Sequence, residues 1–300
     1  MDISWGWNTF FLLILVFFAV VTVSPVVQLI SRSFTADSTA NIAAVKAFGF
    51  IPYEWSLEGY RYLFALGDQL WRSYLVSFGY ATLGTAFGLL LGSMFAYVLY
   101  QSQYYFPWRK AYTIFLFVTM VFGGGLVPFY MLITQYLHLN DTFLLYIVTA
   151  NANIIILRVF MKTSVPDSLL EAARIDGAGH FRIYVFVVMP LMKAALATQA
   201  LFGFVGRWND WFTGLLYMEK PWLIPLQTML WRMQQQVMFL VSNSEMARAA
   251  GPEYARMLAN LPRTSLVTAC TVVAVVPVLF LYPFFQRYFI QGLLVGSLKE

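Results

Sequence analysis

Long stretches without a charged side chain constrain this sequence more than any other feature. Residues 10–30 contain no Asp, Glu, Lys or Arg, and neither do residues 73–108. Only 11% of the 300 residues are charged, whereas soluble domains average about 25%. Hydrophobic residues make up 60% of the chain, more than a soluble fold of this length can hide from water. The composition therefore predicts a chain that folds largely within a lipid bilayer.

Six apolar segments stand between the charged residues, and a helix crosses a bilayer at about 1.5 Å per residue. The fourth segment is shorter than the others, and the fifth is interrupted only by Lys193 near its start. No A-x-A cleavage pattern follows the first segment, which therefore predicts a retained helix rather than a signal peptide. The predicted fold is all-α and polytopic, with six transmembrane helices over residues 10–30, 73–100, 111–137, 143–157, 183–204 and 264–286.

Basic residues in the short connections predict the orientation of the chain in the membrane. The connection after the second span ends in Arg109 and Lys110, whereas the connection after the third span has neither Lys nor Arg. This pattern places both termini in the cytoplasm and the long segments 31–71 and 206–263 outside. The loop after the fourth span, also predicted to be cytoplasmic, carries four basic residues: Arg158, Lys162, Arg174 and Arg182.

Glycines in the second and third spans predict close packing and a bend. Gly84, Gly88 and Gly92 recur every four residues, so they share one helix face on which a neighbouring backbone can come close. Three consecutive glycines at 123–125 interrupt the third span. They lack the spacing and the Lys of a phosphate loop, so we expect a local break in the helix.

The charged segment between the fourth and fifth spans predicts a short amphipathic helix on the membrane surface. Pro166 can occupy its first turn, and Gly177 stands where such a helix ends, at a position that needs a left-handed backbone. An ordinary solvated loop would not need an apolar face, so the helix is expected to lie against lipid headgroups or another protein. The predicted apolar face consists of Leu169, Leu170, Ala172, Ala173 and Ile175.

The same segment resembles the EAA loop of bacterial ABC importer permeases, which is written E-A-A-x3-G-x9-I-x-L-P. The spacing matches throughout, and Val187 and Met189 replace the Ile and Leu of the pattern conservatively. The resemblance implies that a loop over about 163–182 forms a cytoplasmic coupling helix that seats in a cleft of an ATPase subunit. The residues that it assigns to this coupling are Glu171, Ala172, Ala173, Asp176, Gly177 and Pro190.

Further stretches are similar to the carbohydrate uptake branch of these importers, from about residue 70 to the C-terminus. Examples are "GGGLVPFYMLI", "LHLNDTFLLYI" and "FVGRWNDWFTGLLY". Within that branch the chain is most similar to permeases for complex oligo- or polysaccharides, including a permease of the bacterial alginate importer. These residues do not separate alginate from other acidic or plant-derived saccharides.

The resemblance implies the type I importer permease fold and a place in the bacterial cytoplasmic (inner) membrane. It implies a second, related permease as partner, two copies of an ATP-binding subunit and an extracytoplasmic solute-binding protein. No Walker A sequence is present, so the chain is expected to be no enzyme and to hold no cofactor, with ATP and Mg on the partner ATPase.

The chain is expected to divide into two parts. Residues 1–71 hold the first helix and an external segment, and residues 72–300 form the core permease domain. Its external loop, about 206–263, includes the charged stretch 244–258, which either meets the binding protein or caps the helix bundle.

Polar side chains in or beside the spans are candidates for the saccharide pathway, because polar groups at that depth face protein or water. Aromatic rings can stack on the C–H faces of sugars, while amides and carboxylates hold hydroxyl groups. The two tryptophans can instead be interface anchors, and Asp210 would repel an acidic saccharide unless Arg207 pairs with it or it lies off the path. The candidates are Asn151, Asn153, Trp208, Asn209, Asp210 and Trp211.

Other functions remain open at this level. An ion-coupled secondary transporter usually buries carboxylates or histidines in its spans, and spans one to four and span six contain none. A permease for amino acids or peptides, or a purely structural membrane subunit, would also suit the composition. No metal site is expected, because His138 and His180 lack acidic or thiol neighbours at ligand spacing, and Cys270 is the single cysteine.

Overall fold

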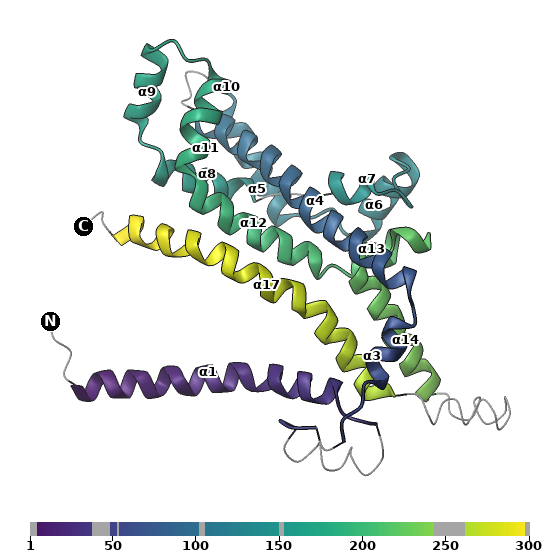
Figure 1. Ribbon diagram of the computed structural model, residues 1–300. Helices are drawn as coiled ribbons and strands as arrows, with labels where there is room; N and C mark the ends of the chain where they lie inside the picture. The colour runs from purple at the N-terminus through teal and green to yellow at the C-terminus, as the bar shows by residue number, and fades with distance from the viewer. Residues whose placement is uncertain are drawn as a thin grey trace. The chain divides into compact units, whose positions relative to one another are not determined.

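The structure is a computed structural model that describes residues 5–37, 49–52, 54–101, 106–149, 153–242 and 262–297 (Figure 1). The described residues are helical apart from short connections and one isolated bridge between Thr35 and Trp55, which confirms the all-α prediction. The charged stretch 244–258 lies outside the described residues. The elements are α1 (Trp5–Ser33), α3 (Glu58–Phe64), α4 (Asp68–Tyr100), α5 (Arg109–Val121), α6 (Leu126–Met131), the π-helix η1 (Leu132–Tyr136), α7 (Leu144–Val148), α8 (Ile154–Ser164), α9 (Asp167–Ile175), α10 (His180–Ile183), the π-helix η2 (Tyr184–Val188), α11 (Met189–Leu191), α12 (Lys193–Trp208), α13 (Phe212–Tyr217), the 3₁₀-helix η3 (Pro221–Leu223), α14 (Leu226–Ser242) and α17 (Arg263–Ser297).

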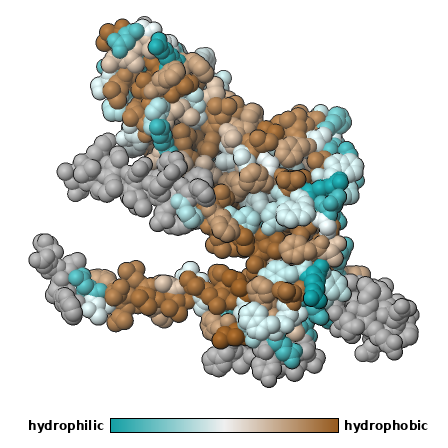
Figure 2. Space-filling model, in the orientation of Figure 1, coloured by the Kyte–Doolittle hydropathy of each residue, from teal (hydrophilic) through white to brown (hydrophobic). Residues whose placement is uncertain are grey.

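Three helices of the described residues are each long and apolar enough to cross a membrane. They lie at Trp7–Ser33 in α1, Asp68–Tyr100 in α4 and Arg263–Leu281 in α17. Two bent helix pairs raise the number to as many as five if each pair forms one span. The side chains of α1 are exposed along most of its length, and its surface is apolar (Figure 2). Lipid or a partner helix is the natural cover for such a surface.

The two bends lie at identifiable breaks in the backbone. Helices α5 and α6 meet at 108° across the three glycines, where Gly125 has a φ of 86° that only glycine adopts readily. The break predicted for the third span is therefore confirmed. The segments His180–Leu191 and Lys193–Trp208 meet at 80°, just after Pro190, so the predicted fifth span is bent rather than straight.

The predicted fourth span is not one helix in the part of the chain that the structure describes. Helix α7 ends at Val148, and α8 begins at Ile154. Asn153 occupies the position before α8, where its side-chain oxygen accepts a hydrogen bond from the backbone N–H of Ile156 (3.5 Å). This capping geometry starts a helix instead of continuing one, so residues 143–157 are not the single short span that the sequence predicts.

The chain forms two compact units. The first contains Met1–Trp71 and Leu230–Leu279, and the second contains Arg72–Met229 and Phe280–Glu300. In the first unit, the backbone N–H groups of Thr264 and Ser265 donate to the carboxylate of Asp37 at 2.6 and 3.2 Å. Asp37 thereby satisfies N–H groups in the first turn of α17, which has no earlier turn to bond them.

In the second unit, the glycine face of α4 is buried. Gly84, Gly88 and Gly92 all lie on this buried side. A Cβ added at Gly84 would lie 3.0 Å from the backbone oxygen of Tyr146 and 3.0 Å from Nε of Arg207. Glycine is needed here because the backbone of another element passes at contact distance.

Asp141 joins two connections in the second unit. Its backbone N–H donates to the carbonyl of Tyr217 (3.0 Å), and its carboxylate accepts the backbone N–H groups of Glu219 (2.7 Å) and Lys220 (3.0 Å). Partial desolvation raises the pKa of this carboxyl, but the two N–H groups and the Lys220 charge outweigh it, so the pKa is lowered overall.

We expect Gly84→Val to lower the thermal midpoint of the purified chain, by an amount equivalent to about 1–3 kcal/mol, because the added methyl groups overpack the contact. Gly206→Val is the matched control, since nothing lies within 4 Å of a Cβ at Gly206. Equal midpoints for the two variants would contradict the close approach.

We also expect Asp141→Asn to lower the thermal midpoint at neutral pH. A lowered carboxyl pKa means that the folded state favours the ionised form, so its stabilisation is present in full above the unfolded pKa of about 3.9 and is lost as the pH falls through the lower folded pKa. The difference between variant and parent should therefore shrink progressively as the pH falls below about 4. Asp176→Asn, at the exposed end of α9, serves as control, and a difference that is undiminished at pH 3 would refute the role of the charge.

Candidate functional site

The charged segment forms the nine-residue helix α9 (Asp167–Ile175). Pro166 precedes it with an extended backbone (ψ 136°), and Asp167 lies in the first turn, where the helix dipole favours a negative charge. Gly177 has a φ of 76°, and its N–H donates to the carbonyl of Arg174 (3.0 Å). The helix therefore ends as the sequence predicts, at a left-handed glycine.

Helix α9 has two apolar faces rather than the single one expected. Leu170 is 4% exposed, and Ala173, three residues later, packs beside it. Leu169, Ala172 and Ile175 lie on the outer side, and 86% of Ile175 is exposed. The five apolar residues are spread around more than half a turn, so they cannot all face one way.

The inner face of α9 is anchored in a buried core of the second unit. The core is closely packed around Leu170, and it joins α4, α8 and the segment that leads through η2 to α12. The hydroxyl groups of Ser93 on α4 and Tyr184 on η2 are hydrogen-bonded at 2.7 Å inside it. Besides Leu170 the core contains Ala96, Tyr97, Leu157, Met161, Val165, Ile183, Tyr184, Val188, Met192 and Ala195.

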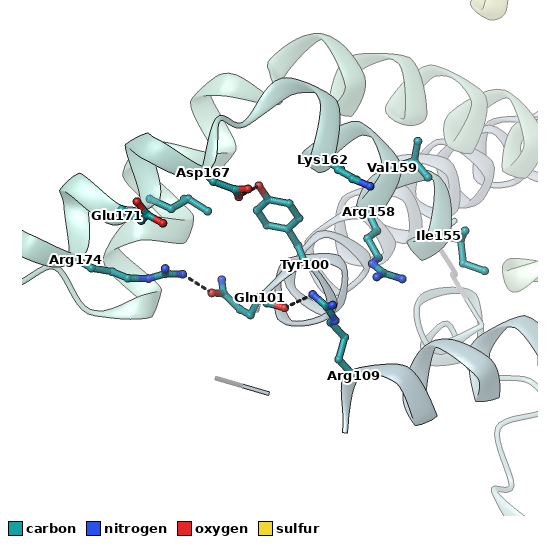
Figure 3. A pocket seen from close by; sticks show the side chains of 11 residues that line it. Tyr100, Gln101, Arg109, Ile155, Arg158, Val159, Lys162, Asp167, Glu171 and Arg174 are labelled. Atoms are coloured by element: carbon teal, nitrogen blue, oxygen red, sulfur yellow. Dashed lines mark hydrogen bonds between the residues drawn. The ribbon is translucent and has the colours of Figure 1, made fainter. Parts of the chain in front are cut away.

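Two polar contacts join α9 to the end of α4 (Figure 3). The hydroxyl of Tyr100 lies 2.7 Å from Oδ1 of Asp167 and 3.0 Å from the carbonyl oxygen of Val165. Arg174 donates through Nη2 to Oε1 of Gln101 at 2.7 Å. Because one contact is near each end of α9, the helix is held to α4 at two points and cannot tilt independently.

The remaining residues assigned to coupling lie on or after α9. Glu171, Ala172, Asp176 and Gly177 are exposed, so their side chains or backbone are available to another protein. Pro190 lies in α11, directly before the bend into α12. The Glu-to-Pro pattern therefore runs from an exposed helix past the core residues Ile183, Tyr184 and Val188 to Pro190, which is exposed.

A second group of predicted residues lines a cavity of about 540 Å³ in the same unit. Asn209, Asp210 and Trp211 are among its lining residues, and their place in a saccharide pathway stays a prediction. The sequence named Arg207 only as a partner that would neutralise Asp210, and it did not predict the remaining members. An arginine beside an apolar segment is itself a signal of function, which would have placed Arg207 among the candidates. The other lining residues are Tyr80, Thr149, Phe202, Gly203, Gly206 and Arg207.

Asp210 is tied to its surroundings by three hydrogen bonds. Tyr80 donates its hydroxyl to Oδ2 (2.8 Å), and the N–H groups of Phe212 and Thr213 donate to Oδ1 at 3.0 Å each. The carboxylate thus caps the start of α13. Arg207 lies in the same cavity and donates to the carbonyl of Gly203 (2.9 Å).

Trp208 does not line this cavity. It is 1% exposed, and its ring stacks on Phe204 with centroids 6.0 Å apart and an interplanar angle of 10°. In this structure Trp208 is a core residue and cannot stack on a sugar. Asn153 caps α8, and Asn151 lies outside the described residues. Within the described ranges, no group of three His, Cys, Asp or Glu side chains is placed to hold a metal ion.

Comparisons with known proteins agree on one family. Residues 84–295 match the family described as binding-protein-dependent transport system inner membrane component. The chain is 35% identical over 292 residues to the polygalacturonan/rhamnogalacturonan transport system permease protein YtcP of Bacillus subtilis (strain 168), covering 95% of each protein. It is 31% identical over 282 residues to protein LplC of the same organism, covering 93% of this chain and 90% of LplC.

A solved structure shares the fold over nearly the whole chain. It is a crystal structure of a bacterial ABC transporter involved in the import of the acidic polysaccharide alginate. The TM-score is 0.77 at 27% sequence identity, and the match covers 96% of this chain and 99% of the other.

We expect Leu170→Ala to lower the thermal midpoint by an amount equivalent to about 2–5 kcal/mol, because it leaves a cavity in the core that anchors α9. Ile175→Ala, on the same helix but exposed, should leave the midpoint unchanged. Thermal unfolding of both variants in the same detergent tests this difference, and similar losses for both would show that α9 is not anchored through its inner face.

Proposed function

This chain belongs to the family of binding-protein-dependent transport system inner membrane components, and we propose that it imports an oligo- or polysaccharide. It is a multi-pass membrane permease of the type I ABC importer fold, a transport component rather than an enzyme. The proposed role is to form half of the translocation pathway and to couple it to ATP hydrolysis by a partner.

The geometry of α9 carries this proposal. Its outer face presents Leu169, Ala172 and Ile175, while Leu170 holds it to the core. Apolar side chains exposed on an anchored surface helix suit a protein partner. The small side chain of Ala172 keeps the outer face slim enough to enter a cleft of an ATP-binding subunit, while Ala173 lets the inner face pack closely on the core.

The same anchoring supports a mechanism of alternating access. When the ATPase dimer closes, a push on α9 reaches α4 through Tyr100 and Gln101, and it reaches α12 through the core around Leu170. A rigid connection of this kind converts a movement at the membrane surface into a rearrangement of the pathway. ATP and Mg bind to the partner ATPase, and this chain holds neither.

The partners that we propose are a second, related permease, two copies of the ATPase and an extracytoplasmic solute-binding protein. Both termini and α9 would then face the cytoplasm. The saccharide assignment is supported by the relatives, since YtcP is described for polygalacturonan and rhamnogalacturonan and the solved transporter for alginate. Acidic saccharides are therefore the first substrates to test, and alginate is one of them.

The assembly is tested by purifying the tagged chain in mild detergent from cells that express its neighbouring genes. Mass spectrometry should identify a stoichiometric ATPase and a second permease. The solute-binding protein can then be screened against uronate-containing oligosaccharides. A chain that purifies alone and monodisperse would overturn the coupling argument and favour an ion-coupled transporter.

We expect Ala172→Trp to uncouple the complex, because an indole on the outer face of α9 cannot enter a cleft made for a methyl group. ATP hydrolysis would lose its stimulation by substrate, and uptake should fall by about tenfold or more, the rate equivalent of about 1.4 kcal/mol. Ala172→Ser, of nearly equal volume, is the matched control. Normal uptake by Ala172→Trp in proteoliposomes would show that this face does not dock.

A further inference from the structure

A second cavity, of about 580 Å³, lies beside α9 and is rich in basic side chains (Figure 3). Glu171, one of the residues assigned to coupling, lines its α9 side, whereas the basic side chains of α5 and α8 belong neither to the saccharide pathway nor to the docking face. Four cations and two carboxylates line it, so its formal charge is positive. The charged lining residues are Arg109, Arg158, Lys162, Arg174, Asp167 and Glu171.

Three of the four basic groups come from α5 and α8, and the fourth, Arg174, lies on α9. Arg158 and Lys162 are four residues apart on α8 and so share a face, and Arg109 is the first residue of α5. Arg109 donates to the backbone carbonyl of Gln101 (2.8 Å), and Arg158 donates to the hydroxyl of Thr113 (3.1 Å). These acceptors orient the guanidinium groups but are neutral, so they do not relieve the repulsion between like charges.

The two carboxylates lie on α9, whereas three of the four basic groups lie on α5 and α8. Asp167 is within hydrogen-bond distance of the Tyr100 hydroxyl, and Figure 3 shows Tyr100 between it and the basic groups of α8. The carboxylates therefore reduce the positive charge of the cavity without occupying its basic side.

A buried amide links α9 to the end of α4. Gln101 is 6% exposed, and its Oε1 accepts from Arg174 on α9. Its side chain also interacts with the hydroxyl of Tyr97, one turn earlier on α4. Gln101 is therefore held in place at the edge of the cavity, where its backbone carbonyl accepts from Arg109.

We propose that this cavity binds a phosphate group, held by Arg109, Arg158 and Lys162. A tetrahedral phosphate offers several oxygens to donors that arrive from different directions, and guanidinium groups bind it in a bidentate manner. Ile155 and Val159 give the rim an apolar side, which suits the acyl part of a phospholipid. Basic pockets between membrane helices commonly hold anionic headgroups. The phosphate belongs either to such a lipid or to a soluble phosphate compound.

The bound phosphate would brace α9 indirectly. It would join α5 and α8 to the end of α4, which in turn holds α9 through Tyr100 and Gln101. Loss of the ligand would leave the basic groups repelling one another beside the helix that docks the ATPase.

Native mass spectrometry of the full chain in detergent tests the lipid source. The parent chain should retain phosphatidylglycerol in preference to phosphatidylcholine. The double variant Arg158→Gln/Lys162→Gln should retain at least about tenfold less phosphatidylglycerol than the parent, because charge-assisted hydrogen bonds are lost. Arg182→Gln/Lys193→Gln removes two exposed cations elsewhere and should retain lipid like the parent. Arg158→Lys/Lys162→Arg, which keeps both charges, should keep most of the binding and guards against a folding defect.

Thermal unfolding with added pyrophosphate tests the soluble source. A higher midpoint for the parent and the control pair, absent in Arg158→Gln/Lys162→Gln, would support a free phosphate ligand even without lipid retention. If neither ligand distinguishes the cavity variant from the control pair, the proposal is overturned. ATPase co-purification does not enter these measurements, so their outcome is independent of the proposed import function.

Discussion

The anchoring of a short helix in a buried core is the constraint on which the candidate function of this protein depends. A nine-residue helix is only marginally stable in isolation, because nucleation is unfavourable in free energy and so few turns form too few hydrogen bonds to offset it. Leu170 inserts into a core shared with α4, α8 and η2, and Tyr100 and Gln101 hold the helix near its two ends. One face of α9 is thereby committed to the protein, and the other is left for a partner. A helix held only by lipid could not transmit a displacement.

Breaks in the helices are the second organising feature. A straight apolar helix only spans the membrane, whereas a bend releases backbone groups and re-aims the segment that follows. The glycines before α6 and the proline before α12 create two such bends. The second bend directs α12 toward the cavity lined by Arg207 and Asp210. The segment that begins at α9 thus ends at this cavity, which gives one continuous stretch of chain from α9 to the candidate pathway.

Two carboxylates of this chain, those of Asp210 and Asp37, accept hydrogen bonds from backbone N–H groups at the start of a helix. Asp210 caps α13, and Asp37 caps α17 from a distant part of the sequence. Neither carboxylate is therefore a simple repulsive charge, and Asp210 can lie beside an acidic sugar while its charge is held by N–H groups and Tyr80. The basic cavity beside α9 differs, because Arg109 and Arg158 are oriented by neutral acceptors and the carboxylates lie on another helix. The charge of Asp210 is already bound by N–H and O–H donors, whereas the charges of Arg109 and Arg158 face neutral acceptors and can still bind an anion.

The sequence alone determined the membrane class, the all-α fold, the break at the glycines and the limits of α9, because composition, glycine conformation and local spacing control these features. The spacing from Glu171 to Pro190 was also sufficient to indicate the family. Tertiary structure alone decided which way side chains face. It buried Trp208, split the apolar residues of α9 between two faces, capped α8 with Asn153 and brought Arg207 and Tyr80 beside Asp210. Hydropathy predicted one span over residues 143–157, where the structure has the end of α7 and the start of α8 as separate helices. Hydropathy measures how apolar a segment is and not whether its helix continues. Packing between distant segments has no local signature, so these arrangements could only be read from the folded chain.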